Sequence, residues 1–130
     1  MPLLKVALSA PPDLGRTANI ASILTMLTNE YLGKDPALTA VTIRYVEQDH
    51  WFIGSQALGE RDPQSFSLHV SVTQGTNVKP QIAAYIAAVF SNMEKILGEI
   101  RDESYVIVDE IPAAAWGYAG KTQEYRLIAG

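Results

Sequence analysis

The chain has 130 residues, of which 48% are hydrophobic and 18% are charged, with a net charge of −4 and no cysteine. This length suits one domain with a single core. The acidic balance and the lack of a Lys/Arg run exclude the basic surface that nucleic-acid binding requires. The lack of cysteine excludes disulfides, thiol nucleophiles and thiolate metal sites.

The sequence also carries no membrane signature. No apolar run approaches the roughly 20 residues that span a bilayer. Pro11-Pro12 interrupts any reading of the first residues as a signal peptide. We therefore expect a protein without a membrane partner and with a cytoplasmic location.

The first half of the chain predicts a strand, a helix and a second strand. Residues 3–9 are extended and apolar, and apolar side chains then recur at helical spacing from Ile20 to Tyr31 before Gly33 ends the helix. Residues 41–46 are β-branched and aromatic, which is typical of a strand.

The second half predicts the same order of elements. Residues 66–73 form the strand, Asn77 is the expected N-cap of a helix with Pro80 in its first turn, and a broad apolar stripe runs to Gly98. Residues 105–110 form the closing strand. The segments 49–64 and 112–130 are expected to form hairpins or edge strands that reach a neighbouring subunit.

A shift of 65 positions superposes residues with strong local meaning. These pairs are Leu32-Gly33 with Leu97-Gly98, Val41 with Val106, Ile43 with Val108, and Trp51 with Trp116. Similarity at a fixed offset indicates a duplicated unit, here with halves of about 1–65 and 66–130 in one domain. We predict an α+β fold in which two β-α-β units form a four-stranded mixed sheet with two helices on one face. Symmetric association is expected to bury the other face.

Four stretches resemble the tautomerase superfamily. They are Pro2-Leu3-Leu4-Lys5 with Gly15-Arg16-Thr17, Gly33-Lys34-x-Pro36-x-x-x-Ala40-Val41, Ser67-Leu68-His69, and Trp116-Gly117-Tyr118-Ala119-Gly120. They are similar to motifs of its malonate semialdehyde decarboxylase, macrophage migration inhibitory factor and 4-oxalocrotonate tautomerase groups. The resemblance implies trimers of duplicated β-α-β units around an amino-terminal proline.

That resemblance gives Pro2 a chemical role. Removal of Met1 would leave a secondary amine at the tip of a buried strand, and α-amino groups titrate near about 7.7–8.0. Burial or neighbouring cations lower this pKa further, so the amine could be a neutral base near pH 7. If Met1 is retained, the proline nitrogen is an amide without basicity.

The resemblance also implies substrate-binding residues. Lys34 and Arg16 match cationic positions of the superfamily that bind a carboxylate, and Tyr105 matches a tyrosine whose hydroxyl faces the substrate. Trp116 is a candidate pocket wall, although burial in the core is the alternative for this residue and packing is the alternative for Tyr105. Arg44 could reach a pocket or form a cross-strand ion pair.

We therefore expect a cofactor-free, homotrimeric keto–enol tautomerase that acts on a small carboxylate-containing 2-oxo acid or enol. One alternative is a decarboxylase or dehalogenase/hydratase-like lyase, with Arg61 binding the substrate. Arg61 stands alone and Leu38 occupies the acidic position of the decarboxylases, which favours isomerisation. A non-catalytic binding or signalling trimer is the other alternative. His50 and His69 lack ligand-spaced partners, so no metal site is expected.

Overall fold

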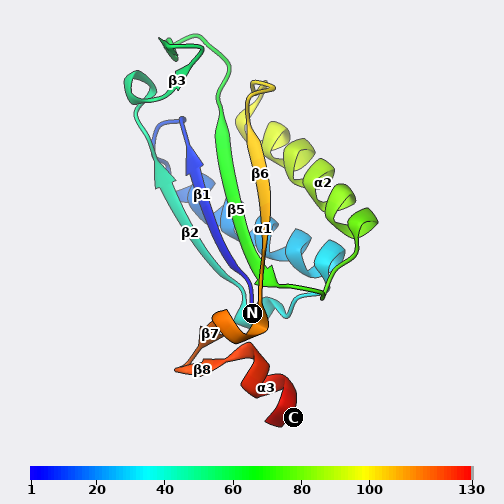
Figure 1. Cartoon of the computed structure of the whole chain (residues 1–130). Coiled ribbons are helices and arrows are strands. Elements are labelled where there is room, and N and C mark those ends of the chain that lie inside the picture. Colours follow the sequence, from blue (N-terminus) through cyan, green and yellow to red (C-terminus); the bar gives the residue numbers. More distant parts are fainter. Residues whose placement is uncertain (130) are drawn as a thin grey trace.

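The computed structural model describes residues 1–129. One mixed sheet has the strand order β2-β1-β5-β6, and two long helices lie on one face of it (Figure 1). The main elements are β1 (Leu3–Leu8), α1 (Leu14–Leu32), β2 (Ala40–Tyr45), β5 (Phe66–Thr73), α2 (Lys79–Leu97) and β6 (Tyr105–Ile111). β1 is parallel to β2, β5 is parallel to β6, and the central pair β1 and β5 is antiparallel. The predicted fold class is confirmed.

Short elements follow the second strand of each half. A short helix, η1 (Pro36–Leu38), precedes β2. The elements that follow β2 are η2 (Gln48–His50), β3 (Phe52–Ile53) and β4 (Gln56–Ala57). Those that follow β6 are η3 (Ala113–Ala115), β7 (Gly117–Tyr118), β8 (Lys121–Thr122) and α3 (Gln123–Ala129). The two hairpins lie at opposite ends of the sheet (Figure 1). Residues 112–129, here called the C-terminal arm, project beyond the sheet next to the start of β1. Helix α3 was not predicted.

The two halves share local geometry at the offset of 65 residues. α1 and α2 have 19 residues each and begin at Leu14 and Lys79. The hairpin turns 54–55 and 119–120 each contain two consecutive residues with positive φ, and glycine is first in one turn and second in the other. The first strands of the two halves do not follow this correspondence. The offset pairs Leu4 with His69, but Leu4 is buried beneath the helices whereas His69 is exposed on the other face.

The core lies between the sheet and the helices. It contains buried aliphatic and aromatic side chains from β1, β5, α1 and α2, including Leu4, Leu24, Phe66 and Tyr85. Thr28 of α1 and Tyr85 of α2 are both fully buried, and their hydroxyl oxygens are 2.9 Å apart. Burial raises the pKa of Tyr85 to about 12.

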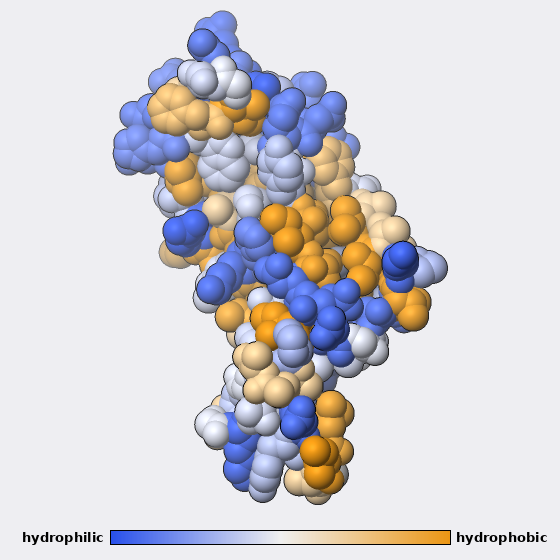
Figure 2. Space-filling view, in the orientation of Figure 1, coloured by the Kyte–Doolittle hydropathy of each residue, from blue (hydrophilic) through white to orange (hydrophobic). Residues whose placement is uncertain are grey.

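The face of the sheet opposite the helices is mixed in character. Lys5, Arg44 and His69 are exposed there and line a shallow hollow, and hydrophilic side chains run across the strands in Figure 2. On β6, the side chains of Tyr105 and Ile107 are 58% and 39% exposed. The centre of this face is therefore polar, and the apolar run of β6 alternates between the core and this open face. Burial of this face by symmetric association stays a prediction.

The start of α2 also differs from the prediction. Val78 is the N-cap residue, and its backbone N–H donates to Gln81 Oε1 at 2.9 Å. The side chain of Asn77 instead donates to the backbone oxygen of Leu32 at 2.9 Å, which joins this loop to the end of α1. Within residues 1–129, no helix combines the length and the apolar character needed to cross a membrane.

Candidate active site

Pro2 lies buried at the start of β1. Its carbonyl oxygen accepts a hydrogen bond from the backbone N–H of Ala40 at 3.2 Å, which attaches the start of β1 to the start of β2. The amino group of Met1 precedes it and is partly buried. Burial, and then the nearby charge of Lys34, lower the pKa of this amino group below its ordinary value.

Lys34 reaches the same region from the end of α1. Gly33 ends the helix in the left-handed conformation, with φ of 69°, which suits glycine and turns the chain toward β2. The side-chain amide of Asn29 donates to the Lys34 carbonyl at 3.0 Å. The Lys34 ammonium donates to Thr76 Oγ1 at 2.8 Å, and burial lowers the pKa of Lys34.

The C-terminal arm completes this end of the molecule. A cavity of 310 Å³ is lined by Met1 and by Tyr118, Lys121, Tyr125, Arg126 and Ala129. The Arg126 guanidinium lies 3.9 Å from the centre of the Tyr118 ring, and its Nη2 donates to the Tyr118 carbonyl at 3.0 Å. Lys121 Nζ lies 5.1 Å from the centre of the Tyr125 ring. Sequence reasoning missed these residues, whose one signal is the alternation of aromatic and basic side chains.

The arm also holds buried donors without an acceptor. Trp116 Nε1, Gln123 Nε2 and Arg126 Nε are inaccessible to solvent and make no hydrogen bond within residues 1–129. Buried N–H groups are nearly always paired in proteins, and an unpaired one is costly. All three atoms are donors that the fold of the arm encloses without an acceptor.

Tyr105 lies at the opposite end of the sheet from Pro2. It pairs with Ser67, which pairs with Ala7, whereas Leu3 beside Pro2 pairs with Ser71. This places Tyr105 four residues along β6 from the row of Leu3, or about 13 Å at 3.3 Å per residue. Within one chain, Pro2 and Tyr105 are not neighbours.

The three arginines predicted as substrate anchors also lie away from Pro2. Arg16 is in the first turn of α1, where its Nη1 donates to the Pro11 carbonyl at 2.9 Å. Arg44 is exposed in the hollow of the open sheet face, and Arg61 is exposed between β4 and β5. Trp116 is partly buried in the arm and does not line the cavity beside Met1. Of the predicted residues, Lys34 is the one whose charge acts on the amino group next to Pro2.

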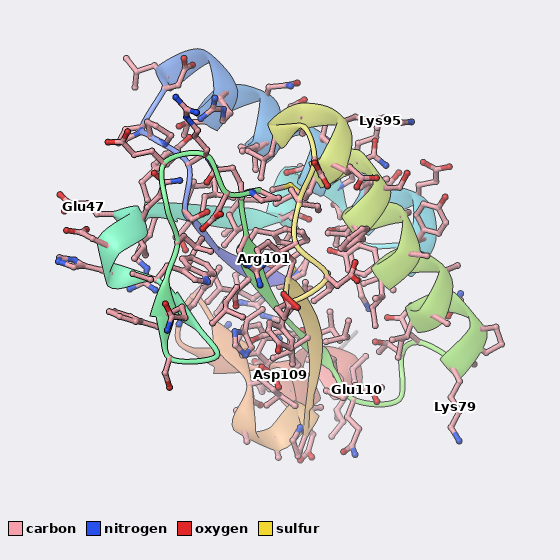
Figure 3. All side chains as sticks on the ribbon, turned by 90° about the horizontal axis from the view of Figure 1, so that it is seen from above. Glu47, Lys79, Lys95, Arg101, Asp109 and Glu110 are labelled. Atoms are coloured by element: carbon pink, nitrogen blue, oxygen red, sulfur yellow. The ribbon has the colours of Figure 1, made fainter. Side chains whose placement is uncertain are left out.

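His50 has two acidic neighbours at η2, and the prediction that it binds no metal stays a prediction. Glu47, Asp49 and His50 are all exposed at η2 and bring possible ligand atoms within 4.8 Å of one another. Glu47 points outward from this turn in Figure 3, as do Lys79 and Lys95 from the two ends of α2. Exposed acidic groups of this kind are common without a metal ion, and these charges lie outside the Pro2 region.

The Pro2 end therefore combines an amine of lowered pKa with cations and phenols. Lys34, Lys121 and Arg126 supply positive charge, and no carboxylate lines the cavity beside Met1. Such a site favours an anionic ligand, because guanidinium and ammonium groups form charge-assisted hydrogen bonds with carboxylates. A neutral amine beside them can accept a proton from a bound acid.

Comparison with known proteins agrees with this geometry. No protein-family model matches the chain. A stretch of 42 residues, 32% of the chain, is 45% identical to the probable tautomerase K2 of Dickeya dadantii and spans 63% of that protein.

Three solved structures share the fold. F6 fused 4-OT, described as a wild-type asymmetric trimer, has a TM-score of 0.84 at 18% identity and covers 95% of this chain and 98% of its own. The structure of Pt0534 inactivated by 2-oxo-3-pentynoate has a TM-score of 0.84 at 16% identity, and the match covers 95% of this chain and 98% of Pt0534. The macrophage migration inhibitory factor-like protein of Entamoeba histolytica has a TM-score of 0.76 at 17% identity, and the match covers 93% of this chain and 97% of that protein. The chain therefore shares its fold with these solved structures, and a stretch of 42 residues is similar in sequence to a probable tautomerase.

Proposed function

We propose that the chain is a cofactor-independent keto–enol tautomerase in which Pro2, once Met1 has been removed, is the general base. The observation that carries this proposal is the position of Pro2, buried at the start of β1 directly after the Met1 amino group, whose pKa is lowered by burial and by the charge of Lys34. A base must be neutral to accept a proton, and a lowered pKa increases the neutral fraction of an amine at a given pH. The substrate is a small 2-oxo acid or its enol.

The reaction moves one proton. In the enol-to-keto direction, the proline nitrogen takes the proton from the enol hydroxyl, and the resulting ammonium delivers a proton to the neighbouring carbon. The positive groups that face this position stabilise the negative charge that develops on the substrate oxygen. No cofactor is needed, because the electrons stay within the substrate.

The substrate carboxylate binds to the cations at this end of the sheet. Lys34 holds the end near the reacting carbon, and Lys121 and Arg126 of the C-terminal arm extend the positive region around the cavity beside Met1. The rings of Tyr118 and Tyr125 supply apolar walls, and each carries one of these cations on its face. In this proposal Lys121 and Arg126 of the arm bind the substrate carboxylate, in place of the predicted arginines that lie away from Pro2 within one chain.

We further propose a homotrimer. The fused 4-OT structure described above is a trimer, and several apolar side chains of this chain are strongly exposed, including Leu14, Leu127 and Ile128. In this assembly Tyr105, Arg16, Arg44 or Arg61 would reach Pro2 from a second copy. Sedimentation equilibrium tests the trimer, and a monomer at micromolar concentration would refute it.

Enol ketonisation tests the role of the base. The rate of phenylpyruvate enol ketonisation is compared between the wild-type protein and Pro2→Ala, after intact mass has established that Met1 is absent from both. We expect the variant to lose at least about 100-fold in kcat/KM, the usual contribution of a positioned general base. Pro63→Ala, a proline outside this region, is the matched control. Equal rates for Pro2→Ala and the wild type would refute the proton-transfer role.

An electrophilic acid provides an independent readout. 2-Oxo-3-pentynoate inactivated the structural neighbour Pt0534. We expect it to add one equivalent of mass to the peptide that begins at Pro2, and a Lys34→Gln variant to react more slowly. Modification spread over surface lysines instead would favour a trimer whose binding pocket is not catalytic.

A further inference from the structure

The loop between β5 and α2 approaches the end of α1 through two side chains. Thr76 Oγ1 donates to the carbonyl oxygen of Thr73 at 2.6 Å and accepts from the Lys34 ammonium at 2.8 Å. Because its proton is directed to the backbone, the hydroxyl presents its lone pairs to Lys34. The contact joins residues 42 positions apart in the sequence.

Asn77 holds the same loop in place. Its side-chain nitrogen donates to the Leu32 carbonyl at 2.9 Å and to Gln81 Oε1 at 3.2 Å. Gln81 Oε1 also accepts from the backbone N–H of Val78 at 2.9 Å. The loop is thus attached both to the last turn of α1 and to the first turn of α2, so the position of the Thr76 hydroxyl relative to Lys34 is fixed.

We propose that Thr76 is a positioning residue that holds the Lys34 ammonium beside the amine at the start of β1. A lysine side chain has four rotatable bonds and otherwise extends its charge into water. The hydrogen bond to Thr76 selects the conformations that keep the charge near the amine. This inference rests on the proposed function, because it explains how the proposed base stays neutral and the proposed carboxylate anchor stays in place.

The other charges around the amine do not replace Lys34. Lys121 and Arg126 of the arm are cations that face it, each stacked on a tyrosine ring. Tyr118 and Tyr125 are phenols and carry no positive charge. Asp109 and Glu110 lie at the end of β6, two strands away from β1. Within residues 1–129, neither carboxylate forms an ion pair with Lys34.

The test compares Thr76→Val, which keeps the shape but removes the acceptor, with Thr76→Ser, which keeps the hydroxyl. The measured quantity is the pH dependence of reductive methylation at the amino-terminal amine, followed by mass spectrometry. We expect Thr76→Val to raise the pKa of this amine by less than one unit, because a unit charge even about 4 Å away contributes only about 1 kcal/mol in water. Thr76→Ser should leave the pKa unchanged. The acid limb of kcat/KM should move with the pKa.

A second pair of variants separates positioning from a general structural effect. In a Lys34→Gln background, Thr76→Val should cause no additional change in the pKa of the amine. An unchanged pKa in Thr76→Val alone, or an equal increase in the Lys34→Gln background, would overturn the inference. If the pKa shifts as expected but Pro2→Ala retains full activity, the proposed function fails and the positioning role of Thr76 stands.

Discussion

Removing the hydroxyl of Thr28 should destabilise the protein more than removing that of Tyr85. The Thr28 hydroxyl donates to the Leu24 carbonyl at 2.7 Å, so the Tyr85 hydroxyl donates to Thr28 across the 2.9 Å contact. Thr28→Val leaves the Tyr85 donor buried without an acceptor, which costs about 1–3 kcal/mol. Tyr85→Phe loses one hydrogen bond, about 1 kcal/mol, while Thr28 keeps its bond to Leu24.

The double variant gives the sharpest test of this asymmetry. With both hydroxyls removed, no donor remains unpaired, so the loss should be smaller than the sum of the single losses by about 1–2 kcal/mol. Urea unfolding at one fixed protomer concentration measures the three free energies, because association contributes to apparent stability. Additive losses, or a larger loss in Tyr85→Phe, would refute the assigned direction of the hydrogen bond.

The pH dependence of stability provides a second measurement on the same pair. The pKa of Tyr85 is about 12 in the folded chain, and that of an unperturbed tyrosine is about 10. The unfolded chain therefore loses this proton first, and the free energy of unfolding falls as the pH rises from about 10 to about 12. Tyr85→Phe should show a smaller fall over this range. Equal slopes would mean that Tyr85 ionises as readily in the folded state as in the unfolded state.

Two further changes test the C-terminal arm. Ala119 has φ of 53°, so Ala119→Gly should stabilise the arm's turn by about 1 kcal/mol and slow hydrogen exchange of the arm amides. Ser55 has φ of 66° in the other hairpin, so Ser55→Gly should slow exchange there in the same way. Faster exchange in either variant would contradict this reasoning. Arg126→Gln should raise KM for a carboxylate substrate about 10-fold with little change in kcat. Glu124→Gln on the same helix should leave KM unchanged. An unchanged KM in Arg126→Gln would show that the arm does not bind the substrate.

The long elements could be predicted because their signals are local. Apolar spacing and the glycines at 33 and 98 indicated both helices, which the structure places at 14–32 and 79–97. Helix α3 was missed because seven residues are too few to establish a period, and Leu127 and Ile128 are exposed. Asn77 was mistaken for the N-cap because its side chain could accept from the helix, but in the fold it binds the end of α1.

The site could be predicted only in part, because its contacts join distant segments. Lys34 follows a glycine in a recognisable motif, so its place near Pro2 was predictable. The contact of Lys34 with Thr76 depends on how two loops meet, and the cavity beside Met1 depends on where the arm turns after β6. The antiparallel pairing of β1 with β5 separates Tyr105 from Pro2, and no local pattern specifies that pairing.

The duplicated plan of the chain limits how many bases it can supply. Strand β5 opens the second half as β1 opens the first, but Phe66 is joined to Ser65 by an ordinary peptide bond, so its nitrogen is an amide and cannot take up a proton near neutral pH. A polypeptide that joins two β-α-β units therefore has one free amino terminus for two units, where two separate chains would have two.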